Sequence, residues 1–303
     1  MTIQPVIVIE KLSKRYRGSQ QLALDSLSLS VYPGEVYGFL GPNGAGKSTT
    51  IRLLMNFLQP TTGSARILGL DCVKDSVALK RSVGYLSGDF AVYPKMTGLE
   101  YLCYLDELQG GGNLKYAKSL AKSFKADLNK KLGELSRGNR QKVGLIQALM
   151  HKPKILILDE PTSGLDPLMQ ELFYAIIADA KSNGVAVFVS SHVLSEVQKM
   201  CDRVGIIRGG TLVTEQVMAD LAKEAAQTFD ITFATEAPVK VLKKIKGLQV
   251  QMHEANHVVI HMHGRLQLLF RVLADYDVVK IDSRTIDLEE LFMHFYENKG
   301  PQK

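Results

Sequence analysis

Short apolar runs alternate with amphipathic segments along the first two thirds of the chain. The continuous apolar runs, which are typical of strands buried on both faces of a parallel sheet, occupy residues 35–40, 83–86, 154–159 and 185–190. Segments with the spacing of helices occupy residues 49–55, 75–80, 140–150, 168–181 and 193–201. This alternation predicts an α/β fold, in which ligands bind at the carboxyl ends of the strands.

Three further patterns frame this core. Residues 6–9 are apolar and residues 22–31 include polar–apolar alternation, which together predict a small antiparallel sheet before the first buried strand. Periodic apolar positions without strand signals between residues 99 and 126 predict a helical insertion that spans about residues 89–150. Residues 204–213 predict a hairpin that turns at two adjacent glycines.

The last third of the chain has a different organisation. Its predicted order is strand, helix, strand, strand, helix, strand, at residues 229–233, 238–246, 248–252, 257–262, 266–273 and 277–281. A final helix is expected at residues 288–296. The order is that of a ferredoxin-like module. We therefore divide the chain into a domain of residues 1–220 and a small α+β accessory or regulatory domain of residues 221–303.

Composition narrows the class of protein. The chain has 303 residues, 46% hydrophobic and 22% charged, which suits one large and one small globular domain. We find neither an apolar stretch of the ~20 residues that a membrane span needs nor the basic start of a signal peptide, so we expect a cytoplasmic protein. Three scattered cysteines give no disulfide framework or metal spacing. The net charge of +6 is spread along the chain, so nucleic acid is not an expected partner.

One segment fits the phosphate-loop pattern G-x-x-x-x-G-K-[ST] between a predicted strand and a predicted helix. Its residues are the expected nucleotide ligands: Gly41, Pro42, Asn43, Gly44, Ala45, Gly46, Lys47, Ser48 and Thr49. The glycines let successive N–H groups point at an anion, and the helix start adds its dipole. Lys47 is expected to reach the β- and γ-phosphates, and the Ser48 hydroxyl to coordinate Mg²⁺.

Acidic residues and a histidine follow two of the buried strands. Asp159 ends an apolar run and Glu160 comes next, so their side chains point in opposite directions and can have different roles. We expect Asp159 to hold Mg²⁺ through water, and Glu160 to orient or deprotonate a water that attacks the γ-phosphate. A kinase is the alternative enzyme, but we see no acceptor motif. His192 is either a satisfied polar residue at a strand end or a contact to the γ-phosphate.

The ordered set of motifs resembles the ATP-binding subunit of an ATP-binding-cassette (ABC) transporter. The matching pieces span roughly residues 5–215: Tyr16, residues 41–49, 135–139, 155–161 and 163–166, and residues 190–192. The resemblance implies a P-loop NTPase cassette with a RecA-like core, an antiparallel β subdomain and a helical insertion. It also implies ATP hydrolysis with Mg²⁺ as cofactor.

The resemblance also implies roles and partners. Two copies would form a head-to-tail dimer with ATP sandwiched between them, each ATP contacting Ser136 and Gly138 of the other copy. Tyr16 would stack on adenine, where the residue alone suggests only an edge-strand aromatic. Glu160 would be the catalytic base, and Lys47 would also be catalytic. His192 would be catalytic as well, as the switch that contacts the γ-phosphate. Asp166 would lie at the subunit interface.

Transport would require a separate membrane-spanning permease, which places this subunit peripherally on the inner face of the cell membrane. The tail resembles those on subunits of bacterial drug and polysaccharide exporters, which implies export. The rivals are a non-transport ABC ATPase acting on nucleic acid or translation, and a nucleotide-binding regulator. A non-transport ABC ATPase of this kind usually has two cassettes or a long coiled coil, and we find neither in this sequence. Glu160 and His192 argue against a nucleotide-binding regulator.

Two departures from the family pattern affect the site. Gly88 stands where a glutamine often helps to hold Mg²⁺, so water or Asp89 is expected to substitute. Arg137 and Asn139 stand where glycine and glutamine are common. Arg137 either adds positive charge near the phosphates or is a solvated cation.

Two surface features stay open. Tyr93, Met96, Leu99 and Tyr101 either form part of a groove for the membrane partner or belong to the core of the insertion. Four histidines cluster across a predicted hairpin of the tail: His253, His257, His261 and His263. No carboxylate or cysteine is clustered with them in a fixed sequence pattern, so a solvated strand face is favoured over a metal site.

Overall fold

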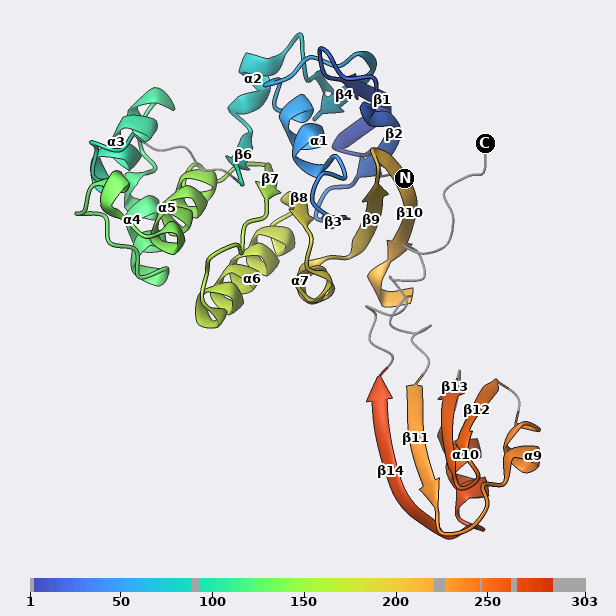
Figure 1. The fold of residues 1–303 in the computed structure, drawn as a ribbon. Coiled ribbons are helices and arrows are strands. Elements are labelled where there is room, and N and C mark those ends of the chain that lie inside the picture. Colours follow the sequence, from blue (N-terminus) through green and yellow to red (C-terminus); the bar gives the residue numbers. More distant parts are fainter. Residues whose placement is uncertain (1–2, 89–92, 221–226, 246, 263–265, 286–303) are drawn as a thin grey trace. The chain divides into compact units, whose positions relative to one another are not determined.

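The computed structural model describes residues 3–88, 93–220, 227–245, 247–262 and 266–285 (Figure 1). The chain divides into two compact units, Met1–Gln216 and Val217–Lys303, which are described separately. The interpretation of the second unit as an accessory or regulatory domain stays a prediction.

A six-stranded sheet forms the centre of the first unit, in the order β10-β9-β3-β8-β7-β6. Its strands are β3 (Val36–Leu40), β6 (Val83–Leu86), β7 (Ile155–Asp159), β8 (Ala186–Ser191), β9 (Arg203–Arg208) and β10 (Thr211–Val217). Strands β6, β7, β8, β3 and β9 pair in parallel. Every residue of β3, β7 and β8 is buried, as continuous apolar runs predict. The connecting helices are α1 (Lys47–Leu54), α6 (Pro167–Ser182) and α7 (Leu194–Met200). The predicted α/β core is confirmed.

A four-stranded antiparallel sheet lies beside this core, in the order β2-β1-β4-β5. Its strands are β1 (Ile7–Arg15), β2 (Leu22–Val31), β4 (Thr62–Ile67) and β5 (Leu70–Asp71), and the short helix α2 (Ser76–Lys80) follows. Strand β1 extends six residues beyond the predicted end at residue 9. Its register shifts after Ile9, and Lys11 has a left-handed φ of 46°. This bulge moves the next buried position from residue 11 to Leu12, so the apolar run ends at residue 9 although the strand continues.

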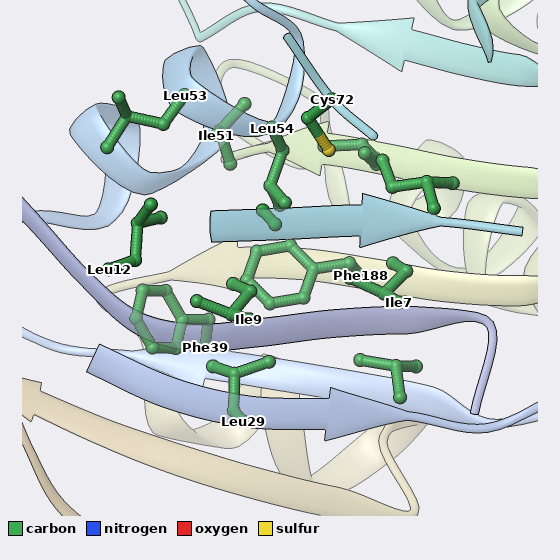
Figure 2. Close-up of a cluster of buried hydrophobic side chains, with 14 of the residues drawn as sticks. Ile7, Ile9, Leu12, Leu29, Phe39, Ile51, Leu53, Leu54, Cys72 and Phe188 are labelled. Carbon is green, nitrogen blue, oxygen red and sulfur yellow. The ribbon is translucent and has the colours of Figure 1, made fainter. Parts of the chain in front are cut away.

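The hydrophobic core of the first unit includes residues of both sheets and of α1 (Figure 2). The rings of Phe39 on β3 and Phe188 on β8 lie 5.3 Å apart, and Ile9 of β1 and Ile51 of α1 are buried in the same cluster. Burying each such side chain stabilises the fold by about 1.5–3 kcal/mol. This packing gives the segment between β3 and α1 a rigid base.

The predicted helical insertion contains α3 (Gly98–Leu108), α4 (Leu114–Ser123), the 3₁₀ turn η1 (Leu132–Glu134) and α5 (Arg137–Leu149). A capping box between Thr97 and Glu100 starts α3. Tyr101 is only 6% exposed, and its hydroxyl donates to Gln147 Oε1 at 2.8 Å. Tyr101 therefore belongs to the core of the insertion, whereas Tyr93 is 56% exposed.

The second unit contains a four-stranded antiparallel sheet in the order β12-β13-β11-β14. Its elements are β11 (Gln227–Phe233), α9 (Val239–Leu242), β12 (Leu248–Glu254), β13 (His257–Met262), α10 (Leu266–Leu273) and β14 (Val278–Thr285). This is the predicted succession, and the first strand lies beside the third and fourth, as in a split β-α-β arrangement. The helix predicted at residues 288–296 lies outside the described residues.

Candidate nucleotide site

The segment between β3 and α1 has the backbone geometry of a phosphate cradle. Gly44 and Gly46 have left-handed φ angles of 80° and 113°, which glycine adopts without strain. A Cβ at Gly41 would lie 2.4 Å from the Ile207 carbonyl oxygen, so only glycine fits there. Helix α1 begins at Lys47 directly after Gly46, which has no side chain to cap it. The N–H groups of the first turn are thus suited to bind an anion.

Lys47 is folded back onto this cradle. Its Nζ donates to the carbonyl oxygens of Gly41 at 2.6 Å and Pro42 at 3.1 Å, and lies 3.7 Å from Glu160 Oε1. The side chain is buried. Burial lowers the pKa of Lys47 below its usual value, and the negative charges of Glu160 and Asp159 oppose this shift. A buried cation beside a glycine-rich turn fits a phosphate group.

Tyr16 lies next to the same helix. Its hydroxyl is 3.1 Å from Thr49 Oγ1, although the two residues are 33 positions apart in the sequence. Tyr16 is 38% exposed, and Lys14 Nζ lies over its ring, 5.8 Å from the centroid. The structure brings Tyr16 to the phosphate loop, and stacking on adenine stays a prediction.

Asp159 and Glu160 at the end of β7 have different partners, although Glu160 lies just beyond the strand and strand alternation does not apply to it. Asp159 is buried and its Oδ1 accepts a 2.5 Å hydrogen bond from Ser190 Oγ on β8. Glu160 has a left-handed φ of 48°, a strain of order 1–3 kcal/mol for a residue with a side chain. Its N–H donates to the Ser190 carbonyl oxygen at 3.2 Å, which helps to hold this conformation.

The strained Glu160 places its carboxylate beside His192. The His192 Nδ1 atom lies 3.1 Å from Glu160 Oε1, the same oxygen that approaches Lys47. The structure thus brings together Lys47 at the start of α1 with Glu160 and His192, each just beyond the carboxyl end of a strand, β7 and β8. A carboxylate with a histidine on one side and a lysine on the other can accept a proton from water near a phosphate.

The segment at residues 136–139 starts helix α5. Ser136 is its N-cap and accepts from the Asn139 N–H at 3.3 Å. A Cβ at Gly138 would lie 2.4 Å from the Gly164 carbonyl oxygen, so this glycine is required for close approach to the loop after Glu160. Arg137 Nη2 donates to Ser163 Oγ of that loop at 2.9 Å. Neither expectation for Arg137 included this contact.

Two further residues have supporting roles that the sequence interpretation did not assign to them. Gln141 of α5 donates from Nε2 to the Pro161 carbonyl oxygen at 2.9 Å and so fixes the loop after Glu160. Asp166 caps α6 by accepting from the Met169 N–H at 3.0 Å, where the family resemblance placed it at a subunit interface. A Ser/Thr/Asp residue before an amphipathic run is the signal that would have identified this cap.

The chemistry of the site suits a magnesium ion. The Ser48 hydroxyl and the Asp159 carboxylate are the hard oxygen ligands that Mg²⁺ prefers. Gly88 lies against Asp159: a Cβ there would be 3.4 Å from Asp159 Oδ2, and its φ is not left-handed. A side chain at position 88 would therefore lie beside the Asp159 carboxylate. The other predicted candidate, Asp89, lies outside the described residues.

The histidines of the tail do not gather as a metal site in the described part of the chain. His257 Nε2 lies 2.5 Å from Asp230 Oδ1, and the His253 and His257 rings are 5.6 Å apart. Asp230 belongs to the neighbouring strand β11, so the spacing of the histidines in the sequence could not indicate this carboxylate. No group of three potential metal ligands occurs among the described residues. His263 lies outside the described residues.

None of the described helices could cross a membrane.

Comparison with known proteins decides the family. Residues 24–163 match the family model described as "ABC transporter". The chain is 33% identical over 297 residues to the bacitracin transport ATP-binding protein BcrA of Bacillus licheniformis, an alignment that covers 95% of this chain and 96% of BcrA. The chain belongs to the ATP-binding subunits of ABC transporters. This ABC subunit accordingly binds and hydrolyses ATP, as the motifs predicted.

Two further comparisons place this ABC subunit among its relatives. It is 34% identical over 228 residues to the probable multidrug ABC transporter ATP-binding protein YbhF of Escherichia coli, which covers 74% of this chain and 39% of YbhF. It thus spans about two fifths of that relative. A bacterial ABC transporter cassette solved as a dimer has the same fold, with a TM-score of 0.65 and 24% identity over 70% of this chain and 98% of that one.

Proposed function

We propose that this ABC subunit powers export through a separate membrane-spanning partner. The supporting observation is that its similarity to the bacitracin transport protein covers the C-terminal domain as well as the cassette. On this proposal the chain is cytoplasmic and binds peripherally to the inner face of the membrane. Purification of the tagged chain from detergent-solubilised membranes should recover a multi-span membrane protein. Recovery of ribosomal or nucleic-acid-bound proteins instead would favour the non-transport alternative.

Within one subunit, Glu160 is the residue that activates water. Its carboxylate accepts the proton of a water as the oxygen attacks the γ-phosphorus, and the bond from that phosphorus to the β-γ bridging oxygen breaks. His192, 3.1 Å away, holds the carboxylate in place and contacts the γ-phosphate. Lys47 leaves its contacts with Gly41 and Pro42 to pair with phosphate oxygens. Mg²⁺, held by Ser48 and through water by Asp159, would neutralise charge on the phosphates.

We further propose that the complete site needs two copies of the chain. Ser136 caps α5 in its own subunit, and its hydroxyl and the first turn of α5 provide donors for the γ-phosphate held by a second copy. Gly138 belongs to that first turn and contributes its backbone N–H to the same phosphate. The resulting homodimer holds two ATP molecules, with Tyr16 stacked on each adenine.

A mixing experiment tests this composite site. The Glu160→Gln variant lacks the proposed base but has unchanged residues 136–138. The Ser136→Glu variant cannot contact the γ-phosphate through residue 136 but has an unchanged Glu160. Each variant alone should have little ATPase activity. In mixed dimers, one site combines Glu160 of the second variant with Ser136 of the first, so activity should rise above both parents. No rise, in mixtures shown to contain heterodimers, would contradict completion of the site by a second copy.

A further inference from the structure

One carboxylate connects the two loops that carry Glu160 and His192. Glu196 of α7 accepts from Thr162 Oγ1 at 2.6 Å with Oε1, and from Ser191 Oγ at 2.8 Å with Oε2. Thr162 and Ser191 are 2% and 1% exposed. Hydrogen bonds from buried hydroxyls to a carboxylate are stronger than neutral ones and are costly to lose.

These bonds fix the backbone close to the reacting groups. Thr162 lies two residues after Glu160, and Ser191 immediately precedes His192. The Ser191 hydroxyl oxygen also accepts from the Val193 N–H at 2.9 Å, so it is bonded to the residue on the far side of His192. Glu196 therefore restrains one end of the Glu160 loop and the start of the His192 loop at the same time.

The restraint matters because Glu160 and His192 follow different strands, β7 and β8. Their 3.1 Å contact depends on the relative position of the two loops, and Glu160 is in a strained left-handed conformation. A strained residue keeps its conformation only where its surroundings hold it. A displacement of catalytic groups by about 1 Å can lower a rate by ~10²-fold.

We propose that Glu196 is a positioning residue for ATP hydrolysis, which acts by aligning Glu160 with His192 through Thr162 and Ser191. This inference rests on the proposed roles of Glu160 and His192. Glu196 is not one of the phosphate-loop residues, so its loss should lower kcat and leave the binding of ATP unchanged.

The competing explanation is that Glu196 only anchors helix α7. A matched control separates the two, because α7 has a second carboxylate contact. Glu171 of α6 lies 2.7 Å from Lys199 Nζ, and both side chains are more than half exposed. Glu171→Ala removes a link between α6 and α7 without touching the loops of Glu160 and His192.

The first test compares three variants by steady-state ATPase assay and thermal unfolding. Glu196→Ala should lower kcat about tenfold or more with the KM for ATP within twofold of wild type. Glu196→Gln should recover most of the rate, because its amide can accept from Thr162 and donate to Ser191 Oγ. Glu171→Ala should stay within about twofold of wild type. A kcat of Glu196→Ala within twofold of wild type would overturn the proposal.

The second test asks whether Glu196 acts through His192. In a His192→Ala background, the additional Glu196→Ala change should lower kcat less than about threefold, because the pair that it aligns is already absent. If Glu196→Ala lowers kcat as much in the His192→Ala background as in the wild-type background, the positioning role is overturned. Glu160→Gln, measured in parallel, tests separately whether Glu160 is the base. Undiminished ATP turnover by this variant would refute Glu160 as the base, but it would not bear on the contacts of Glu196.

Discussion

The close packing of helix α5 against the loop after Glu160 makes a sharp prediction for Gly138→Ala. The added methyl would lie 2.4 Å from the Gly164 carbonyl oxygen, about 1 Å short of the 3.4 Å at which ordinary contact begins. This oxygen belongs to the backbone and cannot rotate away as a side chain could. Gly164 also has a left-handed φ of 79°. The loop must therefore shift, or α5 must.

Either shift has a calculable cost. Overpacking of this size destabilises a protein by about 1–3 kcal/mol, which lowers the Tm of a domain of this size by about 2–4 °C for each kcal/mol. Gly164 lies only four residues after Glu160 in this loop, so we expect a shift of the loop to displace Glu160. We expect kcat to fall by ~10²-fold.

The assays are differential scanning calorimetry of the nucleotide-free protein and phosphate release with saturating ATP. Gly88→Ala is the matched control, since its Cβ would meet Asp159 at an ordinary 3.4 Å and its φ is not left-handed. Its Tm should stay within a few degrees of wild type. A Gly138→Ala protein with wild-type Tm and wild-type turnover would refute the packing on which this reasoning depends.

Three further changes probe the site and the fold. Lys47→Ala removes the buried cation of the cradle and should abolish ATP binding and phosphate release; unchanged turnover would reject the phosphate-loop assignment. Gly88→Gln adds an amide oxygen near Asp159 and should shift the Mg²⁺ concentration for half-maximal activity. An unaltered Mg²⁺ titration would show that position 88 does not affect the metal site. His151 has a pKa lowered by burial, so its contribution to stability is present above about pH 6.5 and is lost as the pH falls through the lowered value. His151→Gln should therefore reduce the loss of Tm on acidification from about pH 7 to pH 5; an equal loss in both proteins would contradict it.

Much of the core could be predicted because its signals are local. The apolar run of β7 indicates a buried strand, and the glycine spacing of residues 41–46 reflects φ angles and close contacts that other residues cannot adopt. The order of these motifs also led to the family. Since the carboxyl ends of parallel strands meet at one edge, the sequence could place Lys47, Glu160 and His192 near each other.

The contacts that hold these residues could not be predicted, because they join side chains distant in the sequence. Ser190 bonds Asp159 across 31 positions, and Arg137 bonds Ser163 across 26. No spacing rule connects such pairs. The bulge at Lys11 and the burial of Tyr101 likewise depend on neighbouring strands and helices. Local sequence patterns predict the helices and strands, but the packing of these elements determines which polar groups form hydrogen bonds.

The most direct test of the central claim, that ATP is bound between two copies and hydrolysed with Glu160 as base, uses Glu160→Gln. The variant should keep the cradle and Lys47 but lose the proton acceptor. With ATP and Mg²⁺, light scattering after gel filtration should give about twice the 33.5 kDa mass of one chain, and ATP should persist. A 33.5 kDa particle with ATP bound, or ATP turned over at the wild-type rate, would contradict the account.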